Sequence, residues 1–168
     1  MKSAYQNIVD EVKNLKRVEE AIALAVEREK EARDFYLQKA VLMENPKFKR
    51  LYEYLAGEEV KHLGYLEEYR DKKELPAVST EIPSGQSFSP EFDPARTKVG
   101  EITLGDAGIL LAAMRHERKS EDFYSELAKR AEDESQRNFF QMLSVYERGH
   151  YELIDSYLED ITGFRMQT

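Results

Sequence analysis

The sequence contains no cysteine, and glycine and proline are scarce except in one segment. The absence of cysteine excludes disulfide bonds, thiolate metal sites, iron–sulfur clusters and cysteine nucleophiles. Any bound metal must therefore be held by carboxylate oxygen and imidazole nitrogen, and these donors suit iron, manganese or zinc. At 168 residues, the chain is long enough to fold as a single domain, residues 1–168, without disulfides.

Long apolar runs are absent as well, so we expect no membrane-spanning segment. No apolar stretch follows the first six residues, so we also expect no signal peptide and a cytoplasmic protein. The net charge of -8 argues against a phosphate-binding surface, which makes nucleic acid an unsuitable partner.

Four of the five prolines fall between residues 73 and 105, and on both sides of this segment apolar residues recur at helical spacing. Asn45 before Pro46, and Asp133 with Gln136 three residues later, are typical of helix starts. A short helical segment is expected near Ala4. The main helices are expected at residues 18–43, 46–72, 106–130 and 133–160. We therefore predict an all-α protein: a ferritin-like four-helix bundle of two repeated hairpins, 18–72 and 106–160, joined by a long crossover, 73–105.

The two predicted hairpins are copies of one another. Residues 25–69 align without a gap on residues 113–157, with 11 of 45 positions identical. Three of the matched pairs are potential metal ligands: Glu29 with Glu117, Glu59 with Glu147, and His62 with His150. Each half thus carries a glutamate on its first helix and a Glu-x-x-His motif on its second. Residues three apart share one helix face, so the glutamate and histidine of each motif can reach a common point.

Each of these six residues interrupts an apolar helix face. Glu29, for example, lies among Ile22, Ala25, Ala32 and Tyr36. A single Glu-x-x-His motif is more often part of a solvated face, but the repeated set is not explained in that way. Four buried carboxylates would repel one another, whereas two divalent ions would cancel their charge. The pattern therefore predicts two divalent metal ions per chain, and its donors suit iron, manganese or zinc; the family resemblance described below implies iron.

Other residues near the predicted ligands allow two interpretations. Tyr36 and Tyr124 follow the ligand glutamates by two turns, so they either donate hydrogen bonds to the carboxylates or simply pack in the core. His116 has no glutamate three residues before it. We interpret it as a surface or boundary histidine rather than as a third imidazole ligand.

These motifs resemble the rubrerythrin branch of the ferritin-like di-iron carboxylate superfamily. The resemblance is carried by residues 29–36 (EKEARDFY), 55–62 (LAGEEVKH), 117–124 (ERKSEDFY) and 147–150 (ERGH). It implies that Glu59 and Glu147 bridge or chelate the metals and that the other four predicted ligands complete the centre. Members of the family reduce peroxide or oxidise ferrous iron at such sites.

Two departures from the family pattern stand out. Typical rubrerythrins carry a cysteine-rich rubredoxin domain that supplies electrons, and this chain has no cysteine. They also have a further glutamate one turn after the first ligand of the third helix, where this chain has Ser120. The neighbouring Glu121 is the one residue that could substitute for it. Few residues follow the fourth predicted helix, so we expect a homodimer rather than a ferritin cage.

Three functions are compatible with the sequence. The first is a di-iron oxidoreductase that reduces peroxide or dioxygen with electrons from an unidentified external donor. The second is an iron-binding, ferroxidase-type module without an organic substrate. The third is a redox-silent scaffold in which zinc fills the site. The metal content of the purified protein, and its optical spectrum after peroxide, would discriminate among them.

Overall fold

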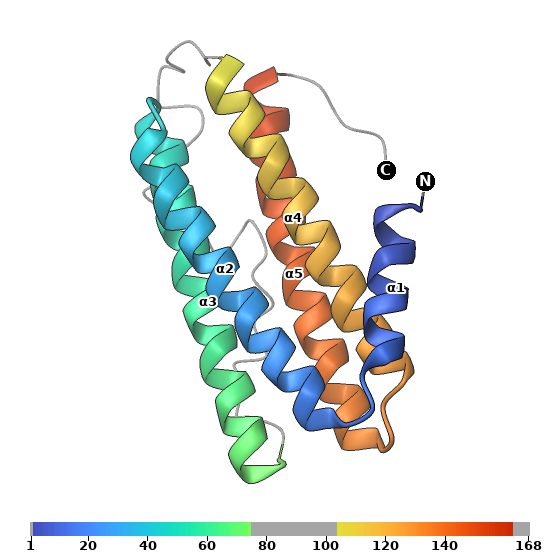
Figure 1. Cartoon of the computed structure of the whole chain (residues 1–168). Helices are drawn as coiled ribbons and strands as arrows, with labels where there is room; N and C mark the ends of the chain where they lie inside the picture. Colours follow the sequence, from blue (N-terminus) through green and yellow to red (C-terminus); the bar gives the residue numbers. More distant parts are fainter. Residues whose placement is uncertain (1, 75–103, 163–168) are drawn as a thin grey trace.

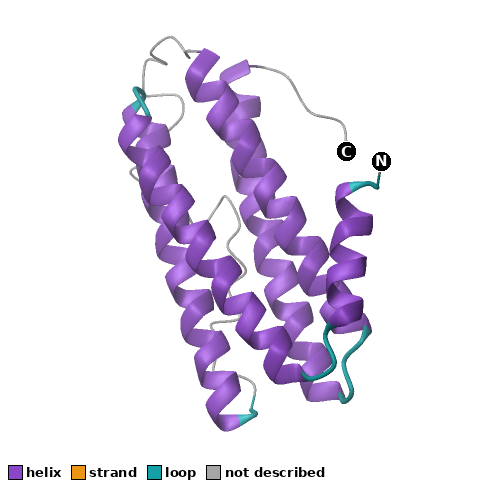
Figure 2. Cartoon of the chain, in the orientation of Figure 1, coloured by secondary structure: helices purple, strands orange, loops and turns teal. Residues whose placement is uncertain are grey.

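In a computed structural model of the protein, residues 2–74 and 104–162 can be described, and all secondary structure among them is helical (Figure 2). The predicted all-α bundle is confirmed. The helices are α1 (Ala4–Asn14), α2 (Val18–Leu42), α3 (Pro46–Lys72), α4 (Leu104–Lys129) and α5 (Glu134–Thr162). The pairs α2/α3 and α4/α5 form two hairpins that lie side by side (Figure 1). Most of the predicted crossover lies outside the described residues.

Short capped turns join the helices within each hairpin. The Asn45 side chain accepts a hydrogen bond of 2.9 Å from the Lys47 N–H, and Pro46 occupies the first helical position of α3. At the second turn, the Gln136 N–H donates to the Asp133 carboxylate at 2.8 Å. The Gln136 side chain accepts in return from the Glu132 N–H, one residue earlier than a standard capping box. Both predicted helix starts are therefore confirmed.

The segment near Ala4 forms a separate helix, α1, which packs against the outside of α4 (Figure 1). Ile8 and Val12 bury its apolar face. The Tyr5 hydroxyl donates to the Glu126 carboxylate at 2.5 Å. On the other side of α1, Glu11 forms an ion pair with Arg28 of α2. The helix thus ties the two hairpins together at one end of the bundle.

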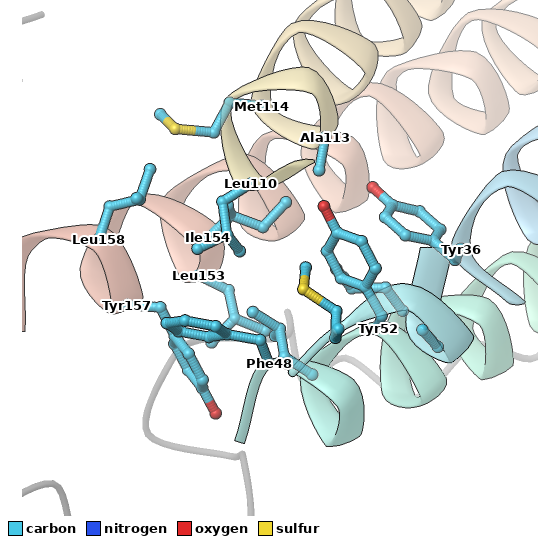
Figure 3. Packing of buried hydrophobic residues seen from close by; sticks show 14 of the residues in the cluster. Tyr36, Phe48, Tyr52, Leu110, Ala113, Met114, Leu153, Ile154, Tyr157 and Leu158 are labelled. Carbon is cyan, nitrogen blue, oxygen red and sulfur yellow. The ribbon is translucent and has the colours of Figure 1, made fainter. Parts of the chain in front are cut away.

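Two apolar clusters fill the bundle, one toward each end. The cluster near α1 includes Ile22 of α2 and Phe139 of α5. The other cluster joins both hairpins, with Phe48 of α3 beside Tyr157 of α5 (Figure 3). Along α2, Glu29 falls between residues of the first cluster and residues of the second. The predicted ligands on the other three helices fall between the clusters in the same way, so apolar side chains close the centre at both ends.

None of the helices among the described residues combines the length and the apolar composition that a membrane crossing requires.

The backbone at the end of α3 has an unfavourable conformation, and its energetic cost can be tested by substitution. Lys73 has φ 56°, in the left-handed region that glycine adopts without steric cost. Its side chain pairs with Glu19 at 3.2 Å, but both residues are exposed, so the pair contributes little. We expect Lys73→Gly to stabilise the protein by roughly 0.5–1 kcal/mol, because glycine removes the strain. Lys73→Ala is the control, since it loses the ion pair and keeps the strain. Urea unfolding that ranks the alanine variant equal to the glycine variant would contradict this account.

Candidate metal centre

The structure brings all six predicted ligands together in the middle of the bundle. None of their side chains is more than 3% exposed. They belong to four helices: Glu29 to α2, Glu59 and His62 to α3, Glu117 to α4, and Glu147 and His150 to α5.

The six residues form two groups of four that share two members. One group contains Glu29, Glu59, His62 and Glu147, and the other contains Glu59, Glu117, Glu147 and His150. Within each group, one ligand atom from every residue lies within 4.8 Å of the others. Glu59 and Glu147 belong to both groups, as expected for carboxylates that bridge two ions. Each of the other four residues belongs to one group only.

Both imidazoles turn the same nitrogen toward the carboxylates. Nδ1 of His62 lies 3.1 Å from Glu59 Oε2 and 3.1 Å from Glu147 Oε1. Nδ1 of His150 lies 3.5 Å from Glu59 Oε1 and 3.7 Å from Glu147 Oε2. The two rings are stacked, with centroids 5.2 Å apart and planes 12° apart. The approximate twofold symmetry expected from the sequence repeat is therefore present in the side chains.

The two tyrosines bond across the hairpins. The Tyr36 hydroxyl, from the first hairpin, donates a hydrogen bond to Glu117 of the second. The Tyr124 hydroxyl, from the second, donates to Glu29 of the first. Of the two interpretations that the sequence left open, the structure supports hydrogen bonding to the carboxylates. Each bond orients one carboxylate that belongs to a single group.

The buried glutamates and histidines of the centre shift one another's pKa values in opposite directions. Burial and the negative charges of Glu147 and Glu59 raise the pKa of Glu29 well above its usual range, and burial with the charge of Glu147 does the same for the pKa of Glu117. Burial alone would also raise the pKa of Glu59 and Glu147, but the imidazoles beside them hold both pKa values below the usual range. Burial opposes protonation of the two histidines, yet the surrounding carboxylates raise the pKa of each.

Many polar atoms of the centre make no well-directed hydrogen bond within the described part of the chain, even where an ion pair brings Nδ1 close to a carboxylate. They are Glu59 Oε1 and Oε2, both ring nitrogens of His62 and of His150, Glu117 Oε2 and Glu147 Oε1. Buried atoms of this kind are costly unless something else binds them. Two divalent ions would bind the oxygens and Nδ1 atoms, and their charge of +4 would balance the four glutamates. The donor set thus fits a pair of iron ions.

Three further residues lie close to the predicted ligands in the sequence. Ser120 is buried on α4, one turn after Glu117. Glu121 pairs with Arg118 at 3.1 Å and belongs to neither group of ligands. This placement does not support the idea that it substitutes for the missing carboxylate. His116 is partly buried and stacks on Phe35, with ring centroids 5.6 Å apart. It also belongs to neither group, in agreement with the interpretation as a boundary histidine.

No role for Glu58 is predicted from the sequence. A glutamate directly before a predicted ligand is ordinarily expected to face solvent. The structure instead buries Glu58 to 6% exposure and places it behind His150 of the other hairpin. No signal within its own helix could have indicated this, because the contact depends on how the two hairpins pack.

A helical bundle whose two carboxylate–imidazole groups share a pair of glutamates has the donor arrangement of a di-metal carboxylate protein. The family model for rubrerythrin matches residues 20–158. The chain therefore belongs to the rubrerythrin family, which consists of ferritin-like di-iron carboxylate proteins. No curated protein and no solved structure shows significant similarity to it.

Proposed function

We propose that the protein binds two iron ions through Glu29, Glu59, His62, Glu117, Glu147 and His150, and that it reduces peroxide or dioxygen. The observation that supports this most strongly is the sharing of Glu59 and Glu147 by two groups of otherwise separate ligands. Electrons would come from an external donor, because a chain without cysteine holds no iron–sulfur centre. The proposal includes a cytoplasmic homodimer, and light scattering should then give a mass of twice 19.6 kDa.

The residues of the centre would have different roles. Glu59 and Glu147 would hold both ions, while one glutamate and one histidine would complete each position. A bound iron pair would supply two one-electron oxidation steps, matching the two-electron reduction of peroxide. Tyr36 and Tyr124 keep their carboxylates oriented. The apolar clusters on both sides exclude bulk water from the centre.

Stoichiometry gives the first test. We expect about two divalent ions per chain, and we expect Glu59→Ala combined with Glu147→Ala to abolish binding of both, because these residues serve both positions. Glu53→Ala combined with Glu152→Ala is the matched control: it removes one exposed glutamate from each of the same two helices. Elemental analysis after dialysis measures the result. Retention of two ions by the first variant would mean that the site lies elsewhere.

Reactivity gives the second test. Protein loaded with ferrous iron and mixed with peroxide, or separately with dioxygen, should be oxidised in a stoichiometric burst. Turnover should then be slow until a reductant is added, because the chain stores no further electrons. Stopped-flow absorbance follows the ferric product, with free ferrous iron and the Glu59/Glu147 alanine variant as controls. Oxidation no faster than that of free iron would favour the iron-binding module, and zinc in the purified protein would favour the scaffold.

A further inference from the structure

The residues that lie behind the His62 and His150 imidazoles differ between the two repeated hairpins, whereas the ligands themselves are identical. In the alignment of the hairpins, the position of Glu58 corresponds to Tyr146, and the position of Tyr65 corresponds to Leu153. Inside the centre, every predicted ligand has an identical counterpart. Outside it, the two histidines have different surroundings.

His150 has a carboxylate behind it. Oε2 of Glu58 lies 4.0 Å from Nε2 of His150, on the side of the ring that faces away from the centre. This distance is longer than a direct hydrogen bond, so the contact is electrostatic. Oε1 of Glu58 pairs with Lys61 Nζ at 2.5 Å. Lys61 is 61% exposed, so water screens its charge, whereas Glu58 is almost completely buried.

His62 has aromatic rings behind it. The Tyr146 ring lies 5.5 Å from the His62 ring, and the Tyr65 ring lies 6.4 Å from it. The two tyrosines stack on one another at 6.1 Å, with 24° between their planes. These rings pack against the imidazole, but they place no negative charge beside it.

We propose that Glu58 is a positioning residue that makes the two metal positions unequal, with the tighter position at His150. A carboxylate behind a ligand histidine fixes the ring with its other nitrogen toward the metal and increases the basicity of that nitrogen. Here it would hold Nδ1 of His150 toward Glu59, Glu117 and Glu147. It also adds one negative charge to that side of the centre only. This inference rests on the proposed binding of two ions.

A titration with cobalt(II) tests the proposal. Calorimetry and the d–d absorption of the bound ion measure the binding. The wild-type protein should bind in two resolved steps. Glu58→Gln keeps the shape and removes the charge, and it should weaken the tighter step by about 10–100-fold while leaving the weaker step in place. Tyr146→Phe is the matched control on the other side, and it should shift neither step by more than about threefold, because it removes no charge.

Histidine variants assign the steps to positions. His150→Ala should lose the tighter step, and His62→Ala should lose the weaker one. Glu58→Asp retains the charge at a greater distance from the ring, so its tighter step should fall between those of the wild type and Glu58→Gln. This variant also provides a readout if Glu58→Gln folds poorly by circular dichroism.

Failure of the proposed metal centre and failure of the proposed role of Glu58 would give different results. A wild-type protein that binds no cobalt would overturn the proposed metal centre itself. Two binding steps of equal affinity in the wild type would overturn only the proposed difference between the two metal positions. The role of Glu58 would be overturned if Glu58→Gln and Glu58→Asp both left the tighter step unchanged. Loss of the tighter step in His62→Ala instead of His150→Ala would show that the assignment is reversed.

Discussion

Removal of metal by a chelator is expected to lower the melting temperature of the protein, and to lower it more at pH 9 than at pH 5. Metal binds ligands that are gathered only in the folded state, so it stabilises that state by about 4 kcal/mol at a thousandfold excess over Kd. For a chain of this size, such a change corresponds to roughly 10 °C. Thermal unfolding followed by circular dichroism, with and without chelator, measures both effects.

The pKa shifts determine the sign of the pH dependence. The raised pKa values of Glu29 and Glu117 contribute stability that is fully present below the unfolded value, about 4.3, and is lost as the pH rises through the folded value. The raised pKa values of the two histidines contribute stability that is present below about 6.5 and is lost in the same direction. The lowered pKa values of Glu59 and Glu147 stabilise the fold above about 4.3, and this contribution is lost only in acid. The metal-free protein should therefore be most stable near pH 5, and equal stability at pH 5 and pH 9 would contradict the buried centre.

Replacing Glu29 and Glu117 together by glutamine should separate stability from metal binding. Glutamine keeps the oxygen that accepts the tyrosine hydrogen bond, but it removes the carboxyl group that must lose a proton at alkaline pH. The metal-free variant should therefore be more stable toward urea than the metal-free wild type at pH 8, because its two side chains carry no proton to lose. At pH 4 the difference should disappear, because the wild-type carboxyls are then protonated.

The same variant should bind metal poorly, because each position loses an anionic ligand and the donor charge falls by two. Urea unfolding of the metal-free proteins at both pH values measures the first effect, and metal analysis measures the second. Glu53→Gln combined with Glu121→Gln is the control, since it removes the same number of charges from residues outside the two ligand groups. If the variant is less stable than the wild type at pH 8, then ionisation of the two buried carboxyls does not destabilise the fold.

Much of this architecture could be predicted from the sequence, because local signals determine it. Apolar spacing and the caps at Asn45 and Asp133 located the helices to within a few residues. The internal repeat identified six residues that the structure then brought together, although their role as ligands stays a prediction. The sequence did not show which carboxylate each tyrosine would contact. That outcome and the burial of Glu58 depend on how one hairpin packs against the other. The position of α1 on α4 likewise depends on tertiary packing.

The crossed bonds from Tyr36 to Glu117 and from Tyr124 to Glu29 have a consequence for the origin of the centre. Neither hairpin completes the centre alone, since Glu29 and Glu117 each accept a hydrogen bond from a tyrosine of the other half. Two identical, unlinked hairpins meeting on a true twofold axis would satisfy the same contacts, so a homodimeric ancestor could have housed the same chemistry. Such an ancestor would have been obliged to keep its halves equal. Within one chain the two halves are free to differ, and they do so at the matched positions of Glu58 and Tyr146.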